Sequence, residues 1–328
     1  MLRVGLLGAG RIGRIHGGNV AAHARAELVA VADASSEAAE SLARDTGAKV
    51  GTIDAIIADK GIGAVLICTP TDMHADLIEA AAKAGKAVFC EKPVDLSSDR
   101  IRACLGVVAK AGTPLMIGFN RRFDPNFASV KARIARGDAG AVELVTILSR
   151  DPSPPPAEYV ARSGGLFRDM MIHDLDMARF LLGEEPVEVH AVGSAIVDPA
   201  IGVAGDVDTA AVLLKTVSGK ICQISCSRRA SYGYDQRIEV HGSKGMIRAG
   251  NVHNTTVEVA TSGGFLADPV QNFFLERYAA AYRNELDAFL AAVEAGTPAS
   301  PSGEDGLRAQ VLADAATEAC FSGKPVRL

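Results

Sequence analysis

Two residues of one apolar segment have the types and spacing for proton transfer. Asp169 and His173 are four residues apart in a stretch that ends at Gly183, so a helix over residues 164–183 would place both on one face. A carboxylate beside an imidazole fixes the tautomer of the ring and stabilises its charged form, as a general base requires. Surface ion pairs have the same spacing, but the apolar neighbours of this pair favour a buried helix.

The same segment does not favour a metal site. His173, Asp174 and Asp176 lie at positions i, i+1 and i+3, which do not converge on a helix, and the histidine spacings typical of zinc sites are missing. We therefore expect no metal ion.

A lysine follows a short buried run directly. Residues 87–90 form an apolar strand, and Glu91, Lys92 and Pro93 come next, which would place the Lys92 ammonium in the crevice where open α/β sheets bind ligands. The neighbouring strand, residues 64–68, leads into a second polar segment that includes Thr69, Pro70 and His74. The alternatives are a solvated loop lysine and a simple helix-start turn; we predict that Thr69, Pro70, His74, Glu91 and Lys92 contact a cofactor.

The first strand of the chain leads into a glycine-rich turn, Gly8-Ala9-Gly10-Arg11-Ile12-Gly13. This spacing is weak alone, but here a strand precedes it and a helix follows. Gly8 would permit the tight turn, Gly10 the approach of a pyrophosphate, and Gly13 close helix–strand packing. The helix that begins at Arg11 and Ile12 would offer its N–H groups to the phosphates.

An acidic residue stands where a dinucleotide site needs one. Asp33 ends the second predicted strand, twenty residues beyond Gly13. A carboxylate there accepts hydrogen bonds from both ribose hydroxyls and repels a 2′-phosphate, which favours NAD over NADP. Ser35 leaves room for use of both cofactors, and the alternative for Asp33 is a helix cap.

The elements around these residues change once along the chain. Up to about residue 120, short apolar runs alternate with helical segments, which predicts a Rossmann-type, doubly wound parallel sheet. Longer runs of period two follow, typical of a mainly antiparallel open sheet covered by helices on one face. The predicted fold is thus α/β followed by α+β, with a NAD-binding domain at residues 1–122 and a substrate-binding and oligomerisation domain at 123–328.

The composition excludes several classes. The net charge of −5 and an aromatic content of 5% without tryptophan argue against nucleic-acid binding. The six scattered cysteines form no CxxC pair and indicate a reducing compartment, so we expect a cytoplasmic protein. No uncharged stretch of about 18 residues occurs, so we expect no membrane span.

These motifs together resemble the glucose–fructose oxidoreductase and inositol dehydrogenase family over essentially the whole chain, with closest similarity to its bacterial inositol 2-dehydrogenases. The resemblance rests on GxGxxG, a Thr-Pro segment, Glu-Lys-Pro and a Gly-Gly…Asp-x-x-x-His helix, which occur here in that order, and on residues 118–124 and 227–242. It implies that Lys92, Asp169 and His173 are catalytic and that Pro93 is a cis proline. Arg122, Asp176 and Tyr232 are further substrate-binding candidates from the motifs in which they lie.

The resemblance also implies the reaction: NAD-dependent oxidation of myo-inositol to 2-keto-myo-inositol, in inositol catabolism, by a homotetramer. The Pro-rich segment 152–156 departs from some family members and leaves the range of substrates open. Another inositol or a sugar, such as scyllo-inositol or an aldose, is one alternative. A non-catalytic nucleotide-sensing regulator is another, although such a protein need not keep Lys92, Asp169 and His173 together.

Overall fold

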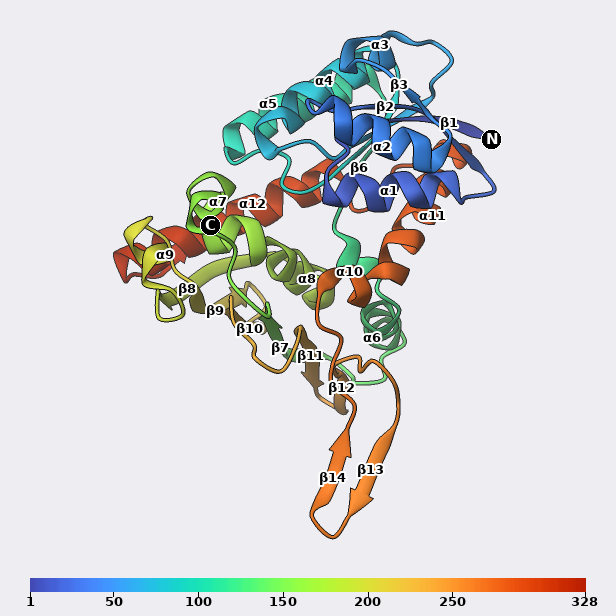
Figure 1. Cartoon of the computed structure of the whole chain (residues 1–328). Coiled ribbons are helices and arrows are strands. Elements are labelled where there is room, and N and C mark those ends of the chain that lie inside the picture. The colour runs from blue at the N-terminus through green and yellow to red at the C-terminus, as the bar shows by residue number, and fades with distance from the viewer. The chain divides into compact units, whose positions relative to one another are not determined.

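The first sheet has six strands, all parallel, in the order β3-β2-β1-β4-β5-β6 (Figure 1). The computed structural model describes residues 1–328, apart from the side chains of residues 157 and 161. The elements of this part are β1 (Leu2–Leu7), α1 (Arg11–Ala21), β2 (Ala26–Ala32), α2 (Ser36–Thr46), β3 (Lys49–Val50), α3 (Ile53–Ala58), β4 (Ala64–Ile67), η1 (Thr71–Met73), α4 (His74–Lys83), β5 (Ala87–Cys90), α5 (Ser98–Ala111), β6 (Leu115–Ile117) and η2 (Asn120–Phe123). This order reverses between β1 and β4, the switch point where Rossmann folds bind dinucleotides.

The buried strands explain why the parallel sheet was predictable. Every residue of β4, β5 and β6 is buried, so both faces of the sheet are covered, as the continuous apolar runs require. The sequence predicts helices over residues 11–23, 36–46, 72–84 and 97–111; α1, α4 and α5 begin and end within two residues of these bounds, and α2 has the expected range. The two-residue strand β3 escaped prediction because Lys49 and Val50 are too few to show a period.

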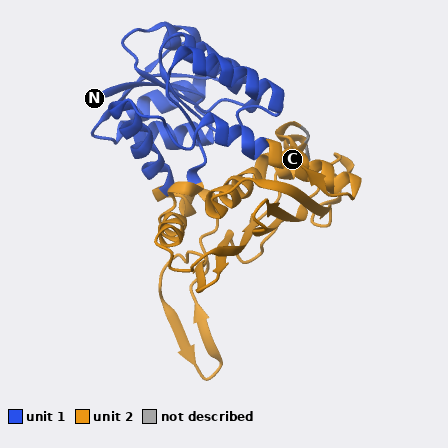
Figure 2. Ribbon diagram, turned by 180° about the vertical axis from the view of Figure 1, so that it is seen from behind, with its two compact units in different colours: residues 1–120, 281–310 blue, residues 121–280, 311–328 orange. Residues whose placement is uncertain are grey.

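The chain returns to the first sheet near its C-terminus. Residues 1–120 and 281–310 form one compact unit, and residues 121–280 and 311–328 form the other (Figure 2). Within the first unit, Phe289 packs edge-on against Phe89 of β5, with ring centroids 5.8 Å apart. Arg25 donates a 2.9 Å hydrogen bond to Asp287. Hydrophobic periodicity alone does not show that a late helix packs on an early sheet.

The second sheet has seven strands in the order β12-β11-β7-β10-β9-β8-β15. Its unit contains α6 (Pro125–Ala135), β7 (Val142–Arg150), α7 (Ala157–Ser163), η3 (Leu166–Met170), α8 (Ile172–Leu182), β8 (Pro186–Ser194), α9 (Pro199–Val203), β9 (Thr209–Thr216), β10 (Ile221–Ser227), β11 (Asp235–Gly242), β12 (Gly245–Ala249), β13 (Glu258–Thr261), β14 (Gly264–Ala267), α10 (Phe274–Arg277) and β15 (Val326–Arg327). Helices α11 (Ala279–Ala295) and α12 (Gly303–Ser322) have residues in both units. The sheet is mainly antiparallel as predicted, except that β7 and β10 run parallel.

One face of this sheet is covered and the other is open within the chain. Helix α8 packs on β7 and β10, and alternate residues of β9 are buried on that side. The other residues of β9 are exposed, Leu213 among them. Because β7 and β10 run parallel, their carboxyl ends lie at the same end of the sheet. The segments that follow these two strands contribute to the site described below.

A two-stranded hairpin extends from the second unit (Figure 1). Strands β13 and β14 pair only with each other, and all of their residues are exposed. The alternating residues 255–261 predict a strand of the main sheet, but the strand begins at Glu258 and belongs to this hairpin instead. No described helix is long and apolar enough to cross a membrane.

Candidate functional site

The glycine-rich turn has the geometry that close backbone approach demands. Gly8 has a φ of +100°, and a Cβ on it would lie 2.4 Å from the carbonyl oxygen of Cys68. A Cβ on Gly13 would lie 2.0 Å from the Gly8 carbonyl oxygen. Helix α1 can therefore pack this closely against the turn only because residue 13 has no side chain. A Cβ on Gly10, the N-cap of α1, would meet no atom within 4 Å. That open space beside the N–H groups of Arg11 and Ile12 fits a dinucleotide pyrophosphate.

Asp33 lies beside the glycine-rich turn. It follows β2, and its two carboxylate oxygens accept hydrogen bonds from the N–H groups of Ala9, at 2.6 Å, and Ser35, at 2.8 Å. Asp33 therefore holds the turn in place. The helix-cap alternative does not describe it, because Ser35 rather than Asp33 accepts the capping hydrogen bond at the start of α2.

The two polar segments after β4 and β5 are joined by a histidine. One ring nitrogen of His74, Nδ1, lies 2.7 Å from the Pro93 carbonyl oxygen, and the other, Nε2, lies 2.8 Å from that of Thr69. The peptide bond between Lys92 and Pro93 is cis, as the resemblance implied. His74 thus clamps the loop that carries Lys92 to the Thr-Pro segment, and both loops lie at the carboxyl edge of the sheet.

Glu91, the residue before Lys92, is buried in a charged cluster. Its Oε1 lies 2.8 Å from Nε2 of His16 on helix α1. Glu285 of α11 is fully buried nearby, and burial, together with the negative charge of Glu91, raises its pKa well above the usual range. Glu285 was not predicted from the sequence. The signal that could have identified it is a single glutamate within an apolar helix.

Asp169 and His173 lie in a broken helix rather than in one continuous helix. Asp169 belongs to η3, a π-turn in which the Met171 N–H donates to the Leu166 carbonyl oxygen at 2.9 Å, and His173 lies in the first turn of α8. The expected single helix over residues 164–183 is therefore wrong. Such π-turns are frequent at functional sites.

The start of the π-turn is fixed by an aspartate from another segment. The Leu166 N–H donates a 2.9 Å hydrogen bond to Oδ2 of Asp206. Gly165 has a φ of +81°, and a Cβ there would lie 2.6 Å from Oδ1 of Asp206. Only glycine combines this conformation with so close an approach. Asp206 and Gly165 together fix the start of the π-turn and therefore the position of Asp169.

Replacing Gly165 by alanine is expected to destabilise the protein by about 1–3 kcal/mol, because the side chain would be strained and would displace Asp206. Activity should fall as well, since the π-turn carries Asp169. Gly106→Ala is the control: Gly106 lies exposed in α5 with no atom near its Cβ position, and this change should stabilise by about 0.4–1 kcal/mol. Urea unfolding of both variants measures the difference, and equal stabilities would contradict the argument.

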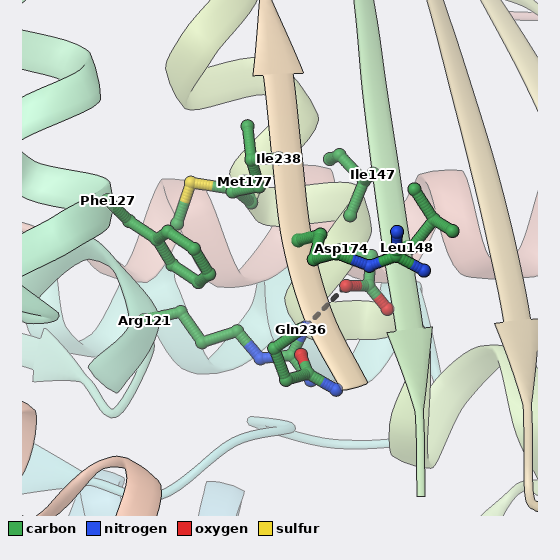
Figure 3. A pocket seen from close by; sticks show the side chains of 9 residues that line it. Arg121, Phe127, Ile147, Leu148, Asp174, Met177, Gln236 and Ile238 are labelled. Carbon is green, nitrogen blue, oxygen red and sulfur yellow. Dashed lines mark hydrogen bonds and ion pairs between the residues drawn. The ribbon is translucent and has the colours of Figure 1, made fainter. Parts of the chain in front are cut away.

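Helix α8 is held by two ion pairs. Arg121 of η2 pairs with Asp174, which is 0% exposed, in a small pocket lined also by Phe127 and Gln236 (Figure 3). Burial raises the pKa of Asp174, and the Arg121 charge opposes that rise. Because Asp174 follows His173 directly, this pair anchors the end of α8 that carries the histidine. Breaking a buried pair of this kind costs about 3–5 kcal/mol.

Two of the substrate-binding candidates form the second pair. Nε and Nη2 of Arg122 donate to the two carboxylate oxygens of Asp176 at 2.8 and 2.6 Å. The third candidate, Tyr232, is 51% exposed, and its hydroxyl donates to Oδ2 of Asp235 at 2.6 Å. It also accepts a 3.1 Å hydrogen bond from Nη1 of Arg150.

Around Asp169, the structure adds residues that we did not predict. Tyr159 of α7 donates a 3.2 Å hydrogen bond from its hydroxyl to Oδ1 of Asp169, and Nη2 of Arg228 lies 3.7 Å from Oδ2. Arg228 lies in a segment that supported the family resemblance, so the motif contained the signal. Tyr159 follows the Pro-rich loop, and no sequence motif indicated its role. Among the described residues, no group of three or more His, Cys, Asp or Glu side chains could hold a metal ion.

The predicted residues divide between the two units. The first unit brings together the glycine-rich turn, Asp33, Thr69, Pro70, His74, Glu91 and Lys92. The second contains Arg122, Asp169, His173, Asp176 and Tyr232. A glycine-rich turn with an acidic residue beside it, at the switch point of a Rossmann-type sheet, and a separate unit that contains Asp169 and His173 together indicate a Rossmann-fold oxidoreductase.

Comparison with known proteins narrows that class. Residues 2–119 match the oxidoreductase family with an NAD-binding Rossmann fold, and residues 127–248 match the GFO/IDH/MocA C-terminal domain. The chain therefore belongs to the GFO/IDH/MocA family, and its cofactor is NAD.

Similar proteins share its full length. The inositol 2-dehydrogenase of Rhizobium meliloti is 58% identical over 327 residues, covering 100% of this chain and 99% of that one. A structure of a myo-inositol dehydrogenase from Corynebacterium glutamicum is 45% identical with a TM-score of 0.96, covering 100% and 99% of the two chains. A scyllo-inositol dehydrogenase from Lactobacillus casei, solved with NAD(H) and scyllo-inositol, is 31% identical with a TM-score of 0.93 and covers 100% and 99%.

Proposed function

We propose that this protein oxidises myo-inositol to 2-keto-myo-inositol with NAD+, in inositol catabolism. The observation that carries the proposal is the 58% identity, over the whole chain, to a protein named inositol 2-dehydrogenase. Lys92, Asp169 and His173, the three residues that the family resemblance marks as catalytic, are all present.

The reaction requires three functions from these side chains: proton removal, orientation of the imidazole ring and stabilisation of negative charge on oxygen. Oxidation of a carbinol removes a hydride from carbon and a proton from oxygen, and NAD+ supplies the hydride acceptor when bound. We assign to His173 the removal of the hydroxyl proton and to Asp169 the orientation of the imidazole ring. Lys92 donates a hydrogen bond to the same oxygen and stabilises its developing negative charge.

For the cofactor, we propose that Gly8, Gly10, Arg11, Ile12 and Gly13 bind the pyrophosphate. Asp33 binds the adenine ribose, and its negative charge disfavours the 2′-phosphate of NADP. Thr69, Pro70, His74, Glu91 and Lys92 border the nicotinamide side. The clamp of His74 on the Thr69 and Pro93 carbonyl oxygens supports a positioning role for its ring.

For the substrate, we propose that Arg122, Asp176 and Tyr232 join Lys92, Asp169 and His173. A polyol ring presents several hydroxyls, each of which both donates and accepts hydrogen bonds. Arg122 and Asp176 are bound to each other by two hydrogen bonds, so each fixes the position of the other's charged group.

The roles of the domains follow from these assignments. We propose that residues 1–122 bind NAD and that residues 123–328 bind the substrate and form subunit contacts, except that residues 281–310 belong to the same compact unit as the NAD-binding sheet. The open face of the seven-stranded sheet, with exposed Leu213 and Val192, supports self-association through this face, and we propose that the assembly is a homotetramer. All six cysteines are free, which supports a cytoplasmic location.

A panel of polyols and sugars tests the proposal. With NAD+, myo-inositol should give the highest kcat/KM among myo-inositol, scyllo-inositol, other inositols and glucose. A higher value for scyllo-inositol or an aldose would overturn the choice of substrate and leave the reaction class intact. NADH binding without turnover of any member of the panel would favour the nucleotide-sensing regulator.

A further inference from the structure

The chemistry proposed above does not use Arg228, a buried arginine beside Asp169. Arg228 follows β10 directly and is 2% exposed, and its backbone N–H donates to the Asp208 carbonyl oxygen at 2.8 Å. Strand β10 runs parallel to β7, with Ser227 opposite Arg150. The residues that follow, Arg228 and Asp151, therefore leave the sheet at the same edge.

The guanidinium group of Arg228 lacks the hydrogen bonds that a buried cation needs. Its Nε and Nη2 atoms are inaccessible to solvent and have no hydrogen-bond partner among the described residues. Nη2 nevertheless lies 3.7 Å from Oδ2 of Asp169, at ion-pair distance. Burying a cation without compensation is costly, and opposite charge nearby is what offsets that cost.

Three acids supply that charge. Asp151 directly follows β7, Asp169 lies in η3 and Asp206 lies in the segment before β9, and each interacts with the Arg228 charge or pairs with it. Burial raises the pKa of Asp151 to about 6, and the Arg228 charge opposes this rise. Burial also raises the pKa of Asp206, and Arg228 again acts in the opposite direction.

The other ionisable groups near this cluster are few. They are Tyr159, whose hydroxyl donates to Asp169; Arg121 and Asp174, which act on Asp151; Cys226, on which Arg228 and Asp151 both act; and Cys320, on which Asp206 acts. His173 follows Asp169 by four residues, in the first turn of α8. Arg228 is the cation that acts on all three acids, whereas Arg121 pairs with Asp174. The electrostatic field at Asp169 therefore depends strongly on Arg228.

We propose that Arg228 is a positioning residue of the dehydrogenase: its positive charge stabilises the negative charge of Asp169 on the π-turn that precedes His173, through the buried side of its guanidinium group. This role rests on the function proposed above, because it acts through the Asp169–His173 pair. The burial of Nε and Nη2 supports it, since a substrate hydroxyl could not reach these atoms.

The test compares three variants of the full-length enzyme. Arg228→Met removes the charge and keeps much of the side-chain volume, Arg228→Lys keeps the charge, and Arg229→Met removes the charge of the exposed neighbour as a matched control. Removing a cation near the Asp169–His173 pair favours every protonated state of that pair. The acidic limb of the pH profile of kcat/KM should therefore move to higher pH in Arg228→Met by about one unit or more.

The expected pattern is specific. Arg228→Lys should keep the acidic limb near its wild-type position even where its kcat is lower, and Arg229→Met should match wild type throughout. An unshifted limb in Arg228→Met, with loss of thermal stability alone, would show a merely structural role and overturn the proposal. If Arg228→Met does not fold, a limb in Arg228→Lys that lies as low as in wild type supports the proposal, and a shifted one overturns it.

A second measurement works without turnover. The carboxyl carbon of Asp169, assigned in 13C NMR by its loss in Asp169→Asn, should titrate at higher pH in Arg228→Met than in wild type. An unchanged titration would overturn the role of Arg228 whatever the substrate is. If the wild-type enzyme oxidises no inositol but this titration shifts, the proposed function fails while the electrostatic role of Arg228 stands.

Discussion

Replacing Lys92 by methionine is expected to lower kcat for inositol oxidation by about 10²–10³-fold, because one charged donor at the developing alkoxide is lost. The binding of NADH, followed by its fluorescence, should stay close to the wild-type value, since the glycine-rich turn and Asp33 are untouched. The His74 ring contacts this loop through the main-chain carbonyl oxygen of Pro93 and not through the Lys92 side chain, so the loop should keep its position in the variant.

The smaller variant Lys92→Ala allows a rescue experiment. Added methylamine should restore part of its activity, because a free ammonium can occupy the space of the missing side chain. Lys110→Met is the control: Lys110 is exposed in the last turn of α5, and this variant should behave as wild type. Wild-type turnover in both Lys92 variants would remove Lys92 from the reaction and leave the site to Asp169 and His173.

The parallel sheet was predictable because its signals are local. Each strand is a short run buried on both faces, and the glycine-rich turn lies between a strand and a helix, the context that a dinucleotide site requires. The position of Asp33 beside this turn was predictable for the same reason: its distance from Gly13 along the chain is set by one helix and one strand.

The second unit was harder because its decisive contacts are distant in sequence. Asp206 fixes the turn at Gly165 from forty residues away, and Arg228 reaches Asp169 from farther still. A break in helical hydrogen bonding at η3 leaves no mark in hydrophobic periodicity, since Leu166, Met170 and Ile172 are all buried. The residue types at Asp169 and His173 could thus be recognised from the sequence, and the break between η3 and α8 that separates them could not.

Replacing His173 by alanine is expected to lower kcat/KM by about 10²–10⁴-fold, the usual contribution of a positioned general base. NADH binding should again stay near wild type. The pH profile is the sharper readout: activity of the wild-type enzyme should fall in acid as His173 takes up a proton, and the residual activity of His173→Ala should lack that limb and rise with hydroxide concentration. Added imidazole should restore part of the rate.

The control for this variant is His253→Ala, which removes an exposed histidine at the base of the β13–β14 hairpin and should leave kinetics unchanged. Asp169→Asn separates the two members of the pair, because the amide keeps the shape and removes the charge that orients the imidazole. Its loss should be smaller than that of His173→Ala, and imidazole should not rescue it, since the ring is still present. If His173→Ala kept its acidic limb, the proton acceptor would be another group of the second unit, and Asp151, whose pKa burial raises to about 6, would be the first to replace.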